Sequence, residues 1–340
     1  MLKVAAITGG AIVPSARFRV RQYIPSLVKE GVMVEEMYPH FGKYPPEDKW
    51  LRPLWAGATL LEMIPKVIKS HDYDVVLLQR EMLSTFVTLE SLTKKPRVLD
   101  VDDAIFLLRN CGFARKLAQM SDQVVCGNTY LANWFGKWNR NVTVLPTAVD
   151  TERYVPLASR GQSENGKVIG WIGTSGNLKY VYAIEATLAK VMETQPNVKI
   201  RIVCDQMPKF RLIDMNRCEF VRWSENIEVE NIQSMDVGIM PLEDSEWGRG
   251  KCSFKMLQYM SCGLPLVASP VGMNAEVLAM GNVGIGASTQ EQWLDALIAL
   301  LDSASMRLDM GAVGRRVAVE SFSIHALAPR LASCLRSACV

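Results

Sequence analysis

The sequence predicts an α/β protein made of two doubly wound domains, each with a parallel sheet covered by helices. Short runs rich in β-branched residues alternate with longer segments of helical period along almost the whole chain. Runs such as 75–78 and 237–240 are apolar without alternation, as is typical of strands covered on both faces. The length of 340 residues is too great for one small core and favours two domains.

Twelve strands are predicted, six in each half of the chain. Those of the first half are Val4–Thr8, Met33–Met37, Val75–Leu78, Val98–Val101, Gln123–Cys126 and Val142–Leu145. Those of the second half are Val168–Ile172, Lys199–Val203, Phe220–Arg222, Val237–Met240, Leu266–Ala268 and Val283–Ile285. Because strands alternate with helices, we expect right-handed βαβ units and parallel pairing.

Helical period fills the spaces between the strands. Ile24, Leu27 and Val28 share one face, and Gly31 is placed to end that helix. The segment from Trp293 to Leu301 repeats the pattern, and 324–338 has it again near the C-terminus.

The polar, glycine-containing segment 156–166 has no apolar period and predicts a linker. We therefore expect domains at 1–158 and 159–322, followed by a C-terminal helix within 323–340. Ligands of doubly wound sheets bind at the carboxyl ends of the strands, so the active site is expected in a cleft between the two domains.

Composition excludes several classes of protein. Apolar residues make up 49% and charged residues 21%, which excludes a disordered or fibrous chain. A net charge of +3 is too balanced for a dedicated nucleic-acid binder. Residues 1–160 hold 21 basic and 16 acidic side chains, and this excess of +5 hints at an anionic or membrane-apposed acceptor.

Cysteine and histidine usage favours a protein without metal. The eight cysteines have no CxxC spacing and several lie in apolar runs, while three histidines are too few for a usual zinc site. We expect reduced thiols, a cytoplasmic location, no metal and no cofactor. No apolar run reaches about 18 residues, so no membrane-spanning helix is predicted. Asp100, Asp102 and Asp103 leave a cation site open as a minor alternative.

The segment Lys49–Lys69 has two interpretations. It holds two tryptophans, three lysines, one arginine and many aliphatic residues, so it could lie flat on an anionic bilayer at the inner face of a membrane. The alternative is a helical insertion packed on its own sheet and broken by Pro53 and Pro65.

The stretch 237–278 is the most informative for chemistry. A buried strand leads to a loop with Gly248 and Gly250, and then Lys251, Ser253 and Lys255 open an apolar helix. Unpaired amides and the positive end of the helix dipole, beside two lysines, are typical of a phosphate site. A solvated surface is the alternative for these lysines.

This stretch, GKCSFKMLQYMSCGLPLVASPVGMNAEVL, resembles the donor-site motif of the retaining, GT-B-fold glycosyltransferases of family 4 (glycosyl transferases group 1). Other pieces lie where that family would have them: TGG (8–10), SARFR (15–19), LDVDDAIF (99–106), VVCGNTYLANWF (124–135), VTVLPTAVDTERYVP (142–156) and VIGWIGTSGNLKY (168–180). The resemblance covers most of the chain and is weakest around residues 40–70.

The resemblance implies a GT-B fold and a nucleotide diphosphate sugar held mainly by the second domain. Its donor and phosphate residues would be Gly173, Thr174, Ser175, Lys179, Lys251, Ser253, Phe254, Lys255 and Gln258. A strand–glycine–helix turn at 173–175 with a nearby lysine also predicts an anion cradle from the residues alone, with an ordinary βα turn as the alternative.

The sequence departs from the family at the two glutamates that stand eight positions apart. Gly250 occupies the first position and Gln258 the second. An amide can bond ribose hydroxyls without carrying charge. The carboxylate that would act at the donor sugar is therefore open, with Glu243, Asp244 and Glu246 as candidates.

The first domain would hold the acceptor, a glycan or a lipid-linked hydroxyl compound. Asp102 and Asp103 follow a strand and are the catalytic candidates, as proton acceptors or as stabilisers of positive charge on the sugar. Helix capping is the alternative. Gly10, Arg17 and Arg19 would lie on the acceptor or phosphate side, since guanidinium groups pair with phosphate, and surface solvation is the alternative for the arginines.

The function expected from the resemblance is sugar transfer from a nucleotide diphosphate sugar to a hydroxyl group with retention of configuration. Two alternatives stay open: a GT-B-fold sugar-nucleotide epimerase, and a catalytically silent subunit that binds a nucleotide sugar. The C-terminal segment would cross back to brace the first domain.

Overall fold

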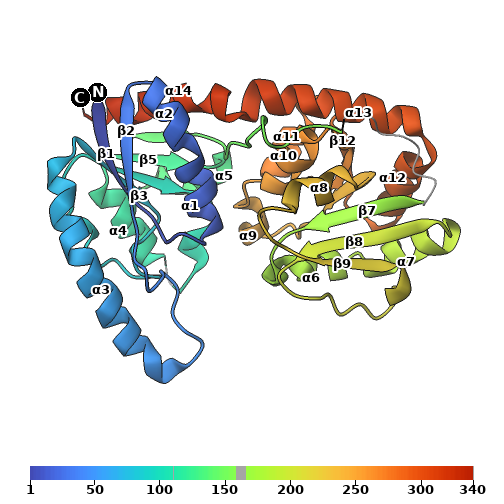
Figure 1. Cartoon of the computed structure of the whole chain (residues 1–340), viewed down its shortest axis with the longest axis horizontal. Coiled ribbons are helices and arrows are strands. Elements are labelled where there is room, and N and C mark those ends of the chain that lie inside the picture. The colour runs from blue at the N-terminus through green and yellow to red at the C-terminus, as the bar shows by residue number, and fades with distance from the viewer. Residues whose placement is uncertain (110, 158–165, 340) are drawn as a thin grey trace. The chain divides into compact units, whose positions relative to one another are not determined.

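The computed structural model describes residues 1–109, 111–157 and 166–339. These form two compact units (Figure 1). Unit 1 comprises Met1–Ala148, Arg249–Cys252 and Ile324–Val340, and unit 2 comprises Val149–Gly248 and Ser253–Ser323. The predicted boundary at 158/159 lies outside the described residues.

Two segments belong to a different unit from the one that the sequence predicts. Residues 149–157 join unit 2, because Val149 N donates to Phe322 O at 2.8 Å and Arg315 donates to the Tyr154 carbonyl at 2.7 Å. Residues 249–252 join unit 1, although the chain on both sides of them belongs to unit 2.

Unit 1 is built on six parallel strands in the order β2-β1-β3-β4-β5-β6. The strands are β1 (Leu2–Ile7), β2 (Val32–Met37), β3 (Val75–Gln79), β4 (Arg97–Val101), β5 (Gln123–Cys126) and β6 (Val142–Val144). The helices are α1 (Pro14–Arg19), α2 (Ile24–Lys29), α3 (Arg52–Lys69), α4 (Gly112–Met120), α5 (Thr129–Phe135) and α14 (Ile324–Ser337).

Unit 2 is built on six parallel strands in the order β12-β11-β10-β7-β8-β9. The strands are β7 (Lys167–Ile172), β8 (Val198–Cys204), β9 (Cys218–Arg222), β10 (Val237–Met240), β11 (Leu266–Ala268) and β12 (Gly284–Gly286). The helices are α6 (Leu178–Tyr182), α7 (Glu185–Thr194), α8 (Glu228–Gln233), α9 (Glu246–Arg249), α10 (Phe254–Ser261), α11 (Met273–Leu278), α12 (Gln290–Asp302) and α13 (Ala304–Val317), with a π-helical turn at Ala318–Phe322.

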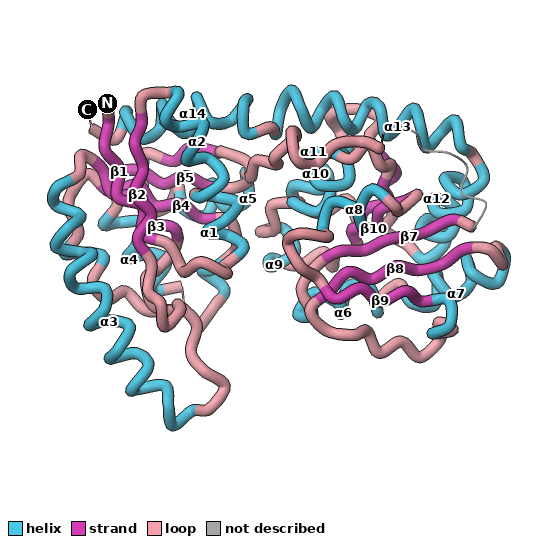
Figure 2. The backbone as a smooth tube through the Cα atoms, in the orientation of Figure 1, coloured by secondary structure: helices cyan, strands magenta, loops and turns pink. Residues whose placement is uncertain are grey.

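The predicted fold class is confirmed. All twelve predicted strands are present, and Figure 2 shows helices flanking the strands in each unit. The strands are apolar on both faces because helices cover both sides of each sheet. All eight cysteines are free thiols.

Each unit has its own apolar core. In unit 1, Val4, Leu77 and Val125 from the sheet pack with Leu331 and Leu335 of α14. The C-terminal helix thus belongs to the core of unit 1. In unit 2, strands and helices pack around the buried Trp171, and α12 begins with a reciprocal cap between Thr289 and Gln292.

The segment 49–69 forms a continuous helix instead of a broken one. Pro53 lies in the first turn of α3, where proline needs no hydrogen-bond partner, and Pro65 lies inside the helix without ending it. Within the described ranges, no helix is long and apolar enough to cross a membrane.

The contact between β10 and α10 generates a stability prediction. A methyl group on Gly238 would meet the Tyr259 ring at 2.5 Å. Tyr259 is fully buried, and its hydroxyl accepts from Ile172 N at 3.2 Å, so the ring has little freedom to move. We expect Gly238→Ala to lower the free energy of unfolding by about 1–3 kcal/mol, measured by urea denaturation.

Gly176→Ala is the control, because no atom lies within 4 Å of the position that its methyl group would take. Equal stability of the two variants would contradict this packing.

Candidate functional site

Each sheet has one place where the winding of the chain changes direction. In unit 1 it lies between β1 and β3, and in unit 2 between β7 and β10. Loops that leave these neighbouring strands run to opposite faces of the sheet, which opens a crevice beyond the carboxyl ends of the strands. The residues after β1, β3, β7 and β10 are therefore the first place to look for a site.

In unit 2, Gly173 follows β7 and lies against Lys255 of α10. A methyl group on Gly173 would be 2.7 Å from Lys255 Cε and 2.8 Å from the ring of Trp171. Lys255 Nζ lies 5.5 Å from the centre of that ring. Glycine is needed here because the lysine chain crosses close to the backbone. The structure thus brings together two of the predicted donor residues.

The helix that carries Lys255 begins at a left-handed residue. Ser253 has φ 52° and ψ 22°. Its hydroxyl donates to Asn274 Oδ1 at 2.6 Å and does not cap the helix. This buried bond holds the residue in a conformation that serine rarely adopts. The first-turn amides of α10, including that of Phe254, have no cap from the Ser253 side chain.

The turn after β7 is tied to the neighbouring strand. Ser175 N and Oγ lie 2.6 and 2.7 Å from the carboxylate of Asp205, which follows β8. Burial raises the pKa of Asp205, but the bonds from Ser175 outweigh it and hold this pKa below its usual value. Thr174 is exposed, and exposed Lys179 lies 4.9 Å from the Tyr180 ring centre.

The predicted ribose contact of Gln258 is wrong. Gln258 is buried, and its amide nitrogen donates to Tyr154 Oη at 3.0 Å and to Glu228 Oε1 at 2.9 Å. The second turn of α10 faces the interior of unit 2, which is why this side chain binds neighbours within the unit. Its amide joins a tyrosine and a carboxylate that lie far from it in sequence.

The predicted acceptor or phosphate role of Arg19 is also wrong. The side chain is buried, with its guanidinium group 2.6 Å from Asp100 Oδ2 and 2.8 Å from the carbonyl of Leu145. It also donates to Thr147 Oγ1 at 3.3 Å. Arg19 is therefore an internal ion-pair partner that ties the start of unit 1 to β4 and to the segment after β6.

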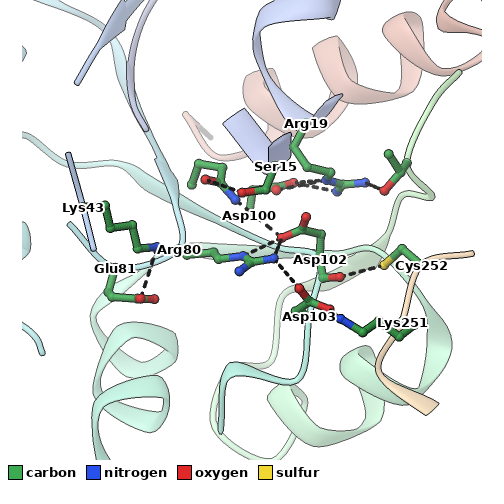
Figure 3. A network of polar contacts seen from close by, with 12 residues as sticks. Ser15, Arg19, Lys43, Arg80, Glu81, Asp100, Asp102, Asp103, Lys251 and Cys252 are labelled. Atoms are coloured by element: carbon green, nitrogen blue, oxygen red, sulfur yellow. Dashed lines mark hydrogen bonds and ion pairs between the residues drawn. The ribbon is translucent and has the colours of Figure 1, made fainter. Parts of the chain in front are cut away.

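A second arginine organises the catalytic candidates, as Figure 3 shows. Arg80 follows β3 with φ 60°, and its guanidinium group lies 2.6 Å from Asp102 Oδ1 and 2.8 Å from Asp103 Oδ2. Burial raises the pKa of Asp102, but Arg80 outweighs it and holds this pKa below its usual value. A carboxylate of lowered pKa is a weak proton acceptor, so this geometry favours electrostatic stabilisation over general-base action.

Lys251 also belongs to unit 1 and extends the same network of charged side chains. Its Nζ lies 2.9 Å from Asp103 Oδ1. Asn128 caps α5 through Leu131 N and also donates to the carbonyls of Arg249 and Lys251 at 3.1 and 3.0 Å. Within unit 1 the ammonium group of Lys251 thus bonds Asp103, and its predicted role at the phosphate stays a prediction.

The loop 249–252 also explains why glycine stands at position 250. A methyl group there would be 2.6 Å from Ala104 Cβ. Cys252 Sγ occupies the space where Gly127 would carry a side chain, and it lies 3.1 Å from the carbonyl oxygen of Asp102. A glutamate at 250 could not be accommodated in this packing.

The loop after β1 meets a further buried ion pair. Lys43 Nζ lies 3.1 Å from Glu81 Oε1, and both side chains are buried. The Lys43 chain passes 3.0 Å from the position that a methyl group on Gly9 would take.

The predicted acceptor-side residues Gly10 and Arg17 lie nearby in the sequence. Gly10 has φ +134° and is buried, and half-buried Arg17 lies over the ring of its neighbour Phe18. The acceptor-side roles predicted for Gly10 and Arg17 stay predictions.

The three aspartates of the candidate cation site are matched by cations of the chain itself. Asp100 pairs with Arg19, and Asp102 and Asp103 pair with Arg80. In the part of the chain that the structure describes, no group of three or more histidine, cysteine, aspartate or glutamate side chains could hold a metal ion. The geometry therefore gives no support to the cation-site alternative.

Sequence reasoning missed Arg80, Lys43, Glu81 and Asn128. A signal was present for two of them, because Arg80 and Glu81 directly follow the buried run 75–79. A charged pair at the end of a buried parallel strand lies at the edge where ligands bind. Lys43 and Asn128 had no such signal, since their partners lie 38 and 121 residues away in sequence.

Known proteins resemble this chain in sequence and fold. Residues 166–303, which lie in unit 2 except for 249–252, match the family described as Glycosyl transferases group 1. The chain is 24% identical over 195 residues to the D-inositol 3-phosphate glycosyltransferase of Corynebacterium urealyticum. That match covers 50% of this chain and 45% of the relative, so it spans less than half of the relative's length.

Two solved structures show the fold. The Anabaena protein HepE, solved in complex with UDP and glucose, aligns over 99% of this chain and 100% of its own, with 16% identity and a TM-score of 0.73. A putative UDP-N-acetylglucosamine 2-epimerase from Listeria monocytogenes aligns over 99% and 96%, with 11% identity and a TM-score of 0.61.

The protein therefore has a GT-B fold, with two Rossmann-like units. Within that fold, residues 166–303 are similar in sequence to the family described as Glycosyl transferases group 1.

The Arg80 network generates a prediction on pH dependence. Arg80→Gln leaves Asp102 and Asp103 without their shared cation, and we expect it to lower the free energy of unfolding by about 3 kcal/mol at neutral pH. The lowered pKa of Asp102 stabilises the native protein above the ordinary aspartate pKa of about 4, and this stabilisation is lost as the pH falls through the lowered pKa. The deficit of the variant should therefore shrink on acidification, as measured by urea denaturation across pH.

Arg153→Gln is the matched control, because its pair with Glu225 at 2.9 Å is largely exposed and should contribute less than about 1 kcal/mol. A deficit of Arg80→Gln that is small or independent of pH would rule out the proposed charge balance.

Proposed function

We propose that this protein is a retaining glycosyltransferase that moves a sugar from a nucleotide diphosphate sugar to a hydroxyl group of a glycan or lipid-linked acceptor. Three findings support sugar transfer: the match of residues 166–303 to the group 1 family, the GT-B fold, and the likeness to a curated glycosyltransferase. Retention and the kind of acceptor are proposed from the motif resemblance described above. We propose a cytoplasmic location, in keeping with eight free thiols.

The close approach of Lys255 to Gly173 carries the proposal. It puts an ammonium group on the turn after β7, at the β7/β10 switch point of a doubly wound sheet. The same lysine lies in the first turn of α10, whose amides and dipole favour an anion. A diphosphate bound there would gain negative charge as the sugar departs, and Lys255 would stabilise that charge in the transition state.

The other predicted donor residues shape the start of α10 or form the turn after β7. Phe254 and Ser253 shape the start of α10, with Ser253 acting through its backbone because its hydroxyl bonds Asn274. Thr174 and Ser175 form the turn that faces the phosphate, and exposed Lys179 follows them. We propose no metal and no cofactor, since the charge of this turn and helix suits the diphosphate without them.

Unit 1 would supply the acceptor side. Asp103 is shared by Arg80 and Lys251, so two cations hold its carboxylate in place. We propose that Asp102 and Asp103 stabilise the positive charge that develops on the donor sugar, and the lowered pKa of Asp102 makes that residue a weak proton acceptor.

Ligand-induced stabilisation tests the donor site. We expect one of the UDP, GDP, CDP or dTDP sugars, at about a hundred times its Kd, to raise the Tm by about 5 °C. Lys255→Ala and Gly173→Ala should abolish this shift, the second because its methyl group displaces the lysine chain. Lys251→Ala is the matched control and should keep the shift, because its amine bonds Asp103.

A full shift in Lys255→Ala, or its loss only in Lys251→Ala, would overturn the assignment of the phosphate site to the β7–α10 turn.

Turnover separates sugar transfer from the two alternatives. The stabilising nucleotide sugar is incubated with a panel of glycan and lipid-linked acceptors, and products are followed by NMR. A glycoside that keeps the anomeric configuration of the donor, with release of the nucleoside diphosphate, supports the proposal. An epimerised nucleotide sugar with no acceptor consumed would show an epimerase, and binding without turnover across the panel would show a silent subunit.

A further inference from the structure

Helix α3 presents an apolar face to solvent. Leu54, Leu61, Ile64 and Ile68 are exposed by 73%, 69%, 42% and 66%, and Trp50, just before the helix, is 91% exposed. We call these five residues the α3 face. Figure 1 shows α3 at the periphery of unit 1, with its N-terminal end extending away from the sheet. So many large apolar side chains on one exposed helix indicate an interaction surface.

Two polar side chains of α3, those of Thr59 and Glu62, have their polar atoms turned away from the exposed apolar face or bonded to neighbours. Thr59 is buried. Glu62, the only acidic residue of the helix, lies 2.5 Å from Lys66 Nζ and 2.6 Å from His40 Nδ1. Burial raises the pKa of Glu62, but Lys66 and His40 outweigh it and lower this pKa to about 2. The charge of Glu62 is thereby balanced by Lys66, and His40 adds a hydrogen bond.

The apolar surface continues beside the helix. A groove of about 340 Å³ is lined by Ile64, Val67, Ile68, His71, Leu89 and Leu92. Leu92 is itself 60% exposed. The surface is therefore wider than a single helical stripe and has room for apolar groups of a partner.

Cations stand at the tryptophan end of the α3 face. Lys49 and Arg52 flank the exposed indole of Trp50, and both are exposed, as are the preceding Glu47 and Asp48. An apolar helix face with a tryptophan and flanking basic residues matches an anionic lipid surface, where the apolar side chains enter the acyl boundary and the amines meet head groups. Residues 1–160, which include it, carry a net charge of +5.

We propose that the α3 face docks unit 1 on an anionic lipid bilayer, with the helix in the plane of the interface and Trp50 at the level of the head groups. This inference does not depend on the proposed sugar transfer. It would place the protein at the inner face of a membrane and bring lipid-linked acceptors near unit 1.

A second copy of the chain fits this face less well. Trp50, Leu54, Gly57, Leu61, Ile64 and Ile68 do follow the 4-3-4-3-4 spacing of a coiled-coil seam. Glycine at the middle of that seam leaves a gap, and no alternating charges flank it, because Pro53, Leu60 and Val67 stand along one side. An exposed apolar face that ends in a tryptophan and has no flanking charge pairs therefore fits the lipid surface better.

Vesicle co-sedimentation of the full chain tests the proposal. We expect binding to phosphatidylcholine vesicles that contain phosphatidylglycerol, weaker binding to pure phosphatidylcholine, and a decrease with added salt. Leu54→Asp combined with Leu61→Asp should weaken binding to the anionic vesicles by about tenfold or more. Lys49→Glu should weaken it less and reduce its dependence on salt.

The matched control combines Leu212→Asp with Leu308→Asp, two leucines of unit 2 with exposures of 61% and 58%. This control should bind vesicles like the unaltered protein. Thermal unfolding of each variant verifies that it is folded, and the nucleotide-sugar shift is recorded separately so that failure of one proposal does not affect the other.

Three results would overturn the proposal: no binding to anionic vesicles, equal loss of binding in the control, or a dimer in solution that the Leu54→Asp and Leu61→Asp pair converts to a monomer. The last result would assign the α3 face to a second copy of the chain.

Discussion

The change of winding direction in each parallel sheet is the constraint on which the rest of this structure depends. Where neighbouring strands send their loops to opposite faces, no crossover covers the edge of the sheet. Arg80 lies at the β1/β3 edge of unit 1. Gly173 and Lys255 lie at the β7/β10 edge of unit 2. The residues that bear the chemistry lie there because the backbone leaves room for them.

The two edges differ in their charge balance. In unit 1 the aspartates at this edge have cations of the chain beside them, as in the pair of Arg19 with Asp100 and the group around Arg80. In unit 2 the turn after β7 combines glycine, a helix N-terminus and Lys255, and the carboxylate of Asp205 bonds Ser175 of that turn. One edge is thus internally neutralised, and the other favours an anionic ligand.

Much of the fold and part of the site could be predicted because they depend on short-range patterns. Buried parallel strands are apolar runs, so all twelve were found. The turn at Gly173 and the helix start at Lys255 were recognised from glycine and lysine in a strand–turn–helix context. The errors at Arg19 and Gln258 share one cause: a polar side chain has the same sequence signal whether it meets a ligand or a distant polar group of its own unit.

The sequence by itself determined the α/β class, the number of strands and the apolar period of each helix, because these follow from the order of apolar and polar residues along the chain. Only the tertiary structure decided which partner each charge meets, why position 250 must be glycine beside Ala104, and which side of α3 faces outward. Those features depend on atoms brought together from distant parts of the chain, and helical period shows that a helix has two faces without showing which of them the rest of the protein covers.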